Sequence, residues 1–162
     1  LGGAAAIVAL ALLSLPRTGA AATDTVLVVR GDVEKPYTLS ATAFAALPRT
    51  RVRAEGHDAK VADYDGVLVH ELLKRAGVKL GAEMRGERVA MAVVVGAADG
   101  YRAVFGLAEL DTAFTDRRIL LADRRDEKPI IPSEGPLRMV VPGERRFARW
   151  VREVTDITVR KL

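Results

Sequence analysis

The sequence predicts an α+β domain in which a mixed β-sheet is combined with short helices. Runs rich in β-branched residues mix with short helical patterns, without the regular strand-helix alternation that is typical of a doubly wound sheet. The length of 162 residues and the hydrophobic content of 49% suit one domain with an ordinary core. Since the chain has no cysteine, that core has to hold the fold without disulfides.

Two strands and a short helix are predicted first. The β-branched run TVLVVRG (25–31) and the extended pattern KPYTL (35–39) flank a polar turn, which favours a strand pair. Ser40 offers an N-cap for the helical segment ATAFAAL (41–47), and Pro48 stops this segment after about two turns.

A hairpin-like stretch and an amphipathic helix are expected next. Within residues 49–67, two short β-like runs lie on either side of the polar loop 55–58. The segment VLVHELLKRAGV (67–78) has apolar residues close to helical spacing, and Gly77 stands where the helix would end. His70 and Glu71 match half of a zinc-protease motif, but Lys74 occupies the position of its second histidine. His70 is therefore interpreted as an ordinary helix residue.

The remaining elements are mostly strands. In residues 88–105 a long strand is predicted to enter a tight turn at Asp99-Gly100, and Tyr101 starts the returning strand. After it we expect a short helix at 106–114, a strand at 119–122, a polar connection at 123–128, a buried strand at 137–141 and a closing strand at 154–159.

The first residues are typical of a secretory signal. The chain begins without Met, runs apolar over 4–15, breaks at Pro16 and reaches small residues before Thr23. About 20 apolar residues are needed to span a bilayer, so this run fits the apolar part of a signal whose charged start is missing. We expect a signal peptide at 1–22, one domain at 23–162, no stable membrane span after cleavage, and a periplasmic or secreted protein. An uncleaved membrane anchor is the alternative.

Composition excludes several classes of function. The net charge is only +4, acidic residues are interleaved with the basic ones, and aromatic residues are few, which argues against binding to nucleic acid. The absence of cysteine removes thiol nucleophiles, thiolate metal sites and iron-sulfur clusters. No serine lies in a nucleophile motif, and two histidines separated by a helix define no catalytic triad.

The order of the motifs resembles the molybdopterin-binding oxidoreductase domain of the sulfite oxidase superfamily. The resemblance runs from about Thr25 to the C-terminus and implies the sulfite-oxidase-type molybdopterin-binding fold. It is carried by five segments, LSATAFAALPRTRV (39–52), YDGVLVHELLKRAGV (64–78), ADGYRAVFGLAEL (98–110), ILLADRRDEKPI (119–130) and GPLRMVVPGERRFARWVREVTDI (135–157).

This resemblance implies a set of residues that bind the cofactor. In the family, basic residues after the VVPG corner approach the pyranopterin, and that pattern falls here on Arg146 and Arg149, followed by Trp150. Guanidinium groups suit such a ligand because their planar fork donates paired hydrogen bonds to phosphate. With His57 and Arg138, these two arginines are the candidate residues for cofactor or anion contact.

The metal ligand of the family is missing. A cysteine thiolate binds molybdenum in the family, and its position falls here on Ala54 or Arg53, neither of which is a plausible ligand. An Asn-Gly turn of the family is likewise replaced by Asp126-Glu127. Because the thiolate tunes the metal, we expect molybdopterin to be absent or bound without normal molybdenum ligation.

Three hypotheses follow from this comparison. The first is a non-catalytic binding or interaction module that retains a pterin or anion pocket, with a small anionic ligand or a periplasmic protein as partner. The second is a molybdopterin-dependent oxidoreductase with unusual metal ligation. The third is a structural or interaction domain that has no ligand.

Overall fold

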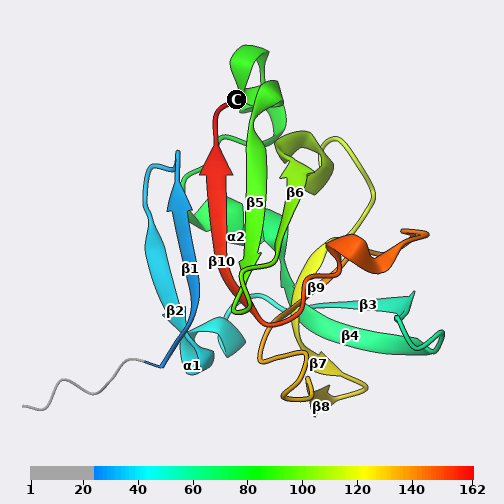
Figure 1. The fold of residues 1–162 in the computed structure, drawn as a ribbon. Coiled ribbons are helices and arrows are strands. Elements are labelled where there is room, and N and C mark those ends of the chain that lie inside the picture. The colour runs from blue at the N-terminus through cyan, green and yellow to red at the C-terminus, as the bar shows by residue number, and fades with distance from the viewer. Residues whose placement is uncertain (1–23) are drawn as a thin grey trace, which may run out of the picture.

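A five-stranded mixed sheet forms one half of the fold (Figure 1). The fold of residues 24–162 is described by a computed structural model. In this first sheet the last strand lies parallel to the first, with Val28 opposite Asp156, and the other neighbours are antiparallel. Its spatial order is β2 (Tyr37–Ser40), β1 (Thr25–Gly31), β10 (Val154–Arg160), β5 (Ala92–Ala97) and β6 (Arg102–Gly106).

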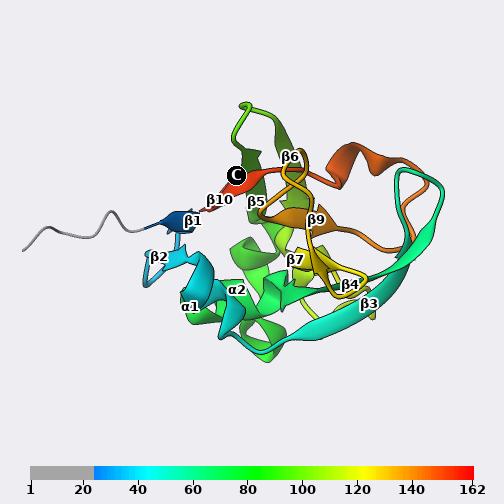
Figure 2. The ribbon, with the colours of Figure 1, turned by 90° about the horizontal axis from the view of Figure 1, so that it is seen from below.

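A second sheet is antiparallel throughout. The strands β3 (Thr50–Glu55) and β4 (Val61–Leu68) form a hairpin, and β4 pairs in turn with β7 (Leu120–Arg125). Two shorter strands, β8 (Lys128–Pro129) and β9 (Arg138–Val140), both pair with β7. Figure 2 shows β3 as the outer strand of the hairpin, and it pairs with β4 alone.

The helices are short, as the sequence predicts. α1 (Ala41–Ala45) begins at Ser40, whose hydroxyl oxygen accepts a hydrogen bond of 3.2 Å from the Ala43 N–H. The helix α2 (Val69–Arg75) buries Val69, Leu72 and Leu73. Four 3₁₀ turns complete the described chain, η1 (Gly81–Glu83), η2 (Gly86–Ala90), η3 (Leu107–Leu110) and η4 (Phe147–Arg149).

The two sheets and α2 share one hydrophobic core. Fully buried side chains from β1, β5, β4 and β7 belong to the same cluster, for example Leu27, Val93, Tyr64 and Leu121. No helix within residues 24–162 is long and apolar enough to cross a membrane.

The α+β class and most elements predicted from the sequence are confirmed. The pair β1 and β2, the cap at Ser40, the β3–β4 hairpin, the buried strand β9 and the closing strand β10 all lie within a few residues of the predictions. His70 lies in α2, as expected for an ordinary helix residue. The predicted signal segment, residues 1–22, lies outside the described residues.

The strand predicted from Arg88 begins only at Ala92, because residues 86–90 form the 3₁₀ turn η2, and the helix predicted at 106–114 is only the 3₁₀ turn η3. Two further boundaries are also wrong. The helix does not begin at Val67, because Val67 and Leu68 complete β4 and pair with Leu121 and Leu120 of β7. The polar connection predicted at 123–128 is mostly strand and tight turn, since β7 continues to Arg125 and β8 begins at Lys128. In both places the pairing with a neighbouring strand overrides the local pattern of the sequence.

Candidate functional site

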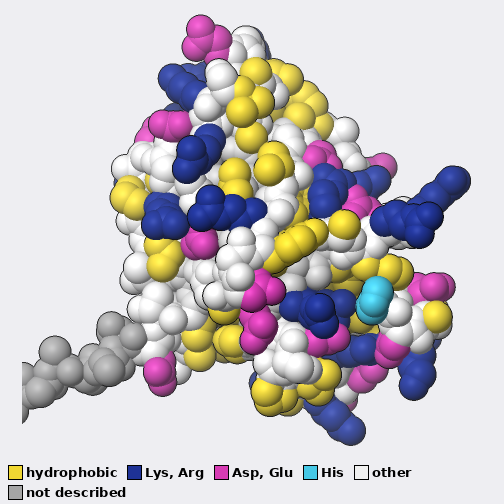
Figure 3. Space-filling view, in the orientation of Figure 1, with side chains coloured by type: hydrophobic (Ala, Val, Ile, Leu, Met, Phe, Trp, Pro, Cys, Tyr) yellow, Lys and Arg dark blue, Asp and Glu magenta, His cyan; other side chains and the backbone are white. Residues whose placement is uncertain are grey.

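The β3–β4 loop and two later segments, β9 and the region around η4, meet at a cavity of about 350 Å³. The β3–β4 loop supplies His57, β9 supplies Arg138, and the segment around η4 supplies the rest. We call this cavity the His57–Arg138 pocket. Its lining residues are His57, Arg138, Arg146, Phe147, Ala148, Trp150 and Arg152. Figure 3 shows a histidine among basic and hydrophobic side chains where the η4 segment faces the β3–β4 hairpin.

Aromatic rings form one wall of the pocket. Trp150 is buried, and its indole N–H donates to the carbonyl oxygen of Val141 at 2.9 Å. Phe147 packs edge-on against Trp150 at a centroid distance of 5.3 Å, and His57 packs edge-on against Phe147 at 5.4 Å. Such edge-to-face pairs fix the orientation of the rings, so this wall is already formed without a ligand.

Arg138 is the buried charge of the pocket. Only 3% of this residue is exposed, its guanidinium is paired with the Glu134 carboxylate, and its Cζ lies 5.5 Å from the centroid of Trp150. Its Nε is buried and has no hydrogen-bond partner among the described residues. A buried donor without a partner is costly, so Arg138 is a buried polar side chain whose hydrogen bonding the described residues leave incomplete.

The pocket is positively charged overall. Besides Arg138, its lining includes the exposed side chains of Arg146 and Arg152, and neither forms an ion pair within residues 24–162. The Glu134 carboxylate beside Arg138 leaves two of the three guanidinium charges uncompensated. The site can therefore attract and hold an anion.

The β3–β4 loop that presents His57 is held in place by contacts with the buried Tyr64 and with Arg125. A Cβ atom at Gly56 would lie 2.6 Å from the Tyr64 hydroxyl oxygen, so the loop approaches this side chain as closely as glycine allows. Asp58 accepts hydrogen bonds of 2.8 and 3.1 Å from Arg125, and these bonds hold the pKa of Asp58 below its usual value. These contacts fix the backbone on both sides of His57.

Arg149 does not line the His57–Arg138 pocket. Its guanidinium hydrogen-bonds to Glu144 and Glu109, which raise its pKa, and it lies 4.6 Å from the centroid of the Phe105 ring. The same Glu109 carboxylate accepts from the Gly106 N–H at 2.7 Å at the start of η3. The structure thus brings His57, Arg138 and Arg146 together, and it places Arg149 where it joins η4 to η3.

The positions that correspond to the family cysteine offer no metal donor. Ala54 is buried in β3 opposite Ala62, and Arg53 is exposed at 3.5 Å from Asp63. Within residues 24–162 no group of three or more histidine or carboxylate side chains is arranged to hold a metal ion. The polar side chains of the pocket are guanidinium groups and one imidazole, and guanidinium groups suit an anion.

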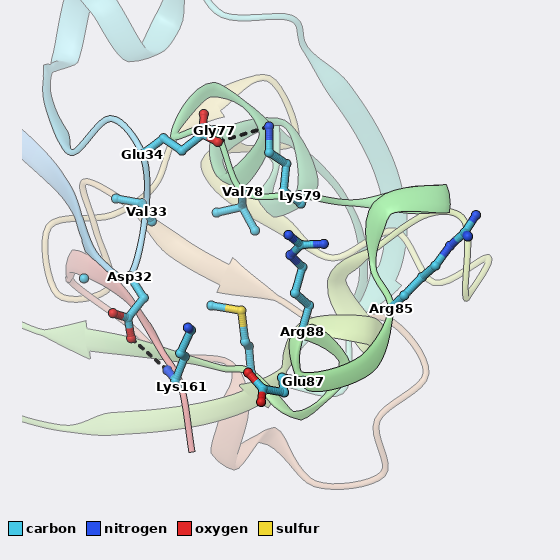
Figure 4. A pocket seen from close by; sticks show the side chains of 12 residues that line it. Asp32, Val33, Glu34, Gly77, Val78, Lys79, Arg85, Glu87, Arg88 and Lys161 are labelled. Atoms are coloured by element: carbon cyan, nitrogen blue, oxygen red, sulfur yellow. Dashed lines mark hydrogen bonds and ion pairs between the residues drawn. The ribbon is translucent and has the colours of Figure 1, made fainter.

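A larger cavity, of about 630 Å³, lies between the β1–β2 loop and η2 (Figure 4). Arg88 and Lys161 point toward its centre, but the charges around it are mixed: Lys79 is paired with Glu34 at 3.0 Å, and the Asp32 carboxylate accepts from the Lys161 backbone N–H. No buried, unpaired polar side chain lies in this cavity, in contrast to the His57–Arg138 pocket.

The sequence matches a model of a known protein family, and the fold is similar to that of a solved structure. A family model described as the oxidoreductase molybdopterin binding domain matches residues 14–162. The crystal structure of the sulfane dehydrogenase SoxCD from Paracoccus pantotrophus resembles the fold with a TM-score of 0.67 and 22% sequence identity. The match covers 85% of this chain and only 38% of that chain. No curated protein matches the sequence.

Proposed function

The chain belongs to the oxidoreductase molybdopterin-binding domain family, and from this membership we propose that it is a non-catalytic module that binds an anionic, pterin-class ligand in the His57–Arg138 pocket. The family supplies the ligand class. The residues of this chain supply an arginine-rich pocket with an aromatic wall and no thiolate.

The three arginines of the pocket are the observation that carries this proposal. Arg138 is a buried charge in the pocket wall, and its partner Glu134 compensates only one of the three guanidinium groups. Arg146 and Arg152 are exposed at the same cavity and can contact further negative charge. Guanidinium groups keep their charge at every physiological pH and donate paired hydrogen bonds to phosphate or carboxylate.

The aromatic wall suits a flat, conjugated ring. Phe147 and His57 contact each other edge-on in the pocket, and Trp150 lies beneath the Arg138 guanidinium. A pterin ring would pack against such side chains by offset or edge-on contacts. Charge and aromatic surface together favour a ligand that combines an anionic group with a ring.

Catalysis at molybdenum is not part of this function. The chain has no cysteine, and the family position falls on Ala54 or Arg53. Neither residue can supply the thiolate that binds molybdenum in the family. Without a first ligand from the protein, the potential and geometry of a metal would not be controlled by this chain.

We propose that the module acts outside the cytoplasm, in the periplasm or after secretion. Residues 1–22 support this location, because their apolar run and small residues fit a cleavable signal. Its partner there would be a small anionic ligand or a periplasmic protein.

Replacing Arg146 by Ala is expected to weaken binding of pterin-6-carboxylate by about tenfold, because one charge-assisted hydrogen bond is lost. Trp150 is the only tryptophan of the chain and lines the pocket, so its fluorescence reports the titration. Arg145→Ala is the matched control, since Arg145 is also exposed but does not line the pocket. Equal weakening by both substitutions, or no binding to the unaltered protein, would contradict the proposed site.

A further inference from the structure

We propose that the open edge of β3, with the arginines beside it, binds an extended acidic segment of a partner protein. This surface shares no lining residue with the His57–Arg138 pocket. It therefore does not depend on the ligand proposed for that pocket, and the two can be tested separately.

The first observation is an unpaired strand edge. β3 pairs with β4 alone and is the outer strand in Figure 2. Beyond that pairing, no backbone N–H or carbonyl group of residues 51–54 makes a hydrogen bond within the described part of the chain. An edge strand of this kind can accept one more strand by main-chain hydrogen bonding.

The second observation is a groove of about 540 Å³ along the same strand. One side is formed by three consecutive residues of β3, and the other by two loops, one before β7 and one after β9. The lining residues are Arg51, Val52, Arg53, Asp116, Arg117, Arg118, Pro142 and Gly143. An extended chain laid beside β3 would lie in this groove.

The charge of the groove selects the partner. It contains four arginines and a single carboxylate, that of Asp116. Arg51, Arg53 and Arg117 approach carboxylates only at 3.5 to 3.9 Å, and Arg118 forms no ion pair within residues 24–162. Such long, exposed contacts contribute little, so these guanidinium groups can turn to an acidic partner at small cost.

Other occupants fit less well. Residues 1–22 of the same chain contain no Asp or Glu and could not match the arginines. A second copy that paired through its own β3 edge would bring Arg51 and Arg53 against the same arginines, so like charges would face each other. Single-stranded nucleic acid would need aromatic side chains for stacking, and the groove lining has none.

The test uses a labelled synthetic peptide of about six residues, the length of β3, in which Glu alternates with Val and Thr. Fluorescence polarisation is expected to give a Kd on the order of 10–100 μM, with no measurable binding of the version that carries Lys in place of Glu. Methylation of alternate backbone nitrogens of the peptide should abolish binding, because it removes N–H groups that would donate hydrogen bonds to the carbonyl groups of β3.

Charge reversal on the protein provides the matched control. Arg53→Glu with Arg118→Glu should weaken binding of the acidic peptide at least about tenfold. Arg102→Glu with Arg160→Glu makes the same change in net charge on the other sheet. This control should leave binding of the acidic peptide unchanged. Thermal unfolding of both double variants verifies that they fold.

Four results would overturn this inference. The first is no binding of the acidic peptide at about 1 mM. The second is equal binding of the Lys peptide. The third is equal binding of the methylated peptide. That result would mean that the arginines bind acidic side chains without main-chain pairing to β3. Binding of a short duplex DNA in preference to the peptide would likewise identify a different class of partner.

Discussion

Replacing Arg138 by Met should destabilise the protein by about 3 kcal/mol and abolish ligand binding in the His57–Arg138 pocket. The substitution keeps an apolar stem of similar length but leaves the Glu134 carboxylate without its partner beside Trp150. Removing one partner of a buried ion pair costs about 3–5 kcal/mol, and the lower value applies because Glu134 is partly exposed. Urea unfolding measures the stability, and titration with pterin-6-carboxylate measures the binding.

A second substitution separates the two effects. Glu134→Gln in the Arg138→Met background removes the unpaired carboxylate, so most of the lost stability should return while binding stays absent. A folded Arg138→Met protein that still binds pterin-6-carboxylate as tightly as the unaltered protein would show that Arg138 is structural only.

Replacing Gly66 by Ala should be similarly disruptive, at about 3 kcal/mol or more. A Cβ atom at this position would lie 2.2 Å from the Leu121 carbonyl oxygen and 2.6 Å from the Ala122 Cα. Both are backbone atoms of β7, so β4 and β7 would have to separate where the strand register already shifts. Because backbone cannot move aside as a flexible side chain can, we expect a large drop in unfolding temperature.

Gly106→Ala is the matched control for this prediction. Gly106 has a negative φ of −67°, and within 4 Å of an added Cβ lies only a carboxylate oxygen of Glu109 at 3.9 Å. The expected change is within about 0.5 kcal/mol. Similar unfolding temperatures for the two variants in differential scanning calorimetry would mean that the close approach of β4 and β7 is not a constraint.

Much of the fold could be predicted because local signals agree with tertiary contacts in many elements. The β-branched run of β1 coincides with a strand that has neighbours on both sides, and Ser40 both ends β2 and caps α1. Gly77 follows α2 with a φ of +79°, the left-handed conformation that favours glycine after a helix.

The errors lie where local signals conflict with pairing. Val67 and Leu68 fit a buried strand as well as an amphipathic helix, and only their pairing with β7 decides between the two. The β7–β8 turn is formed by Asp126 and Glu127, both with positive φ, a conformation for which Asn-Gly is preferred. The sequence carries no such signal here, so the hairpin was not predicted.

The site was predictable in part for a related reason. The arginine pattern after the VVPG corner identified the segment, but spacing alone does not tell which way each side chain points around a 3₁₀ turn. Arg146 lines the pocket, whereas Arg149 is held by Glu109 and Glu144, two carboxylates from different segments. Phe147 and Arg152 were missed because nothing in their local sequence distinguishes them from core or surface residues.

Quantification of molybdenum and released pterin per chain, in protein isolated after export by its native host, tests the central claim most directly. We expect pterin bound at a substantial fraction of one per chain, with molybdenum far below it, because the pocket offers arginines and no thiolate. Near-stoichiometric amounts of both would contradict a non-catalytic module and identify a molybdenum centre with unusual ligation. The absence of both would contradict the pterin-class ligand itself.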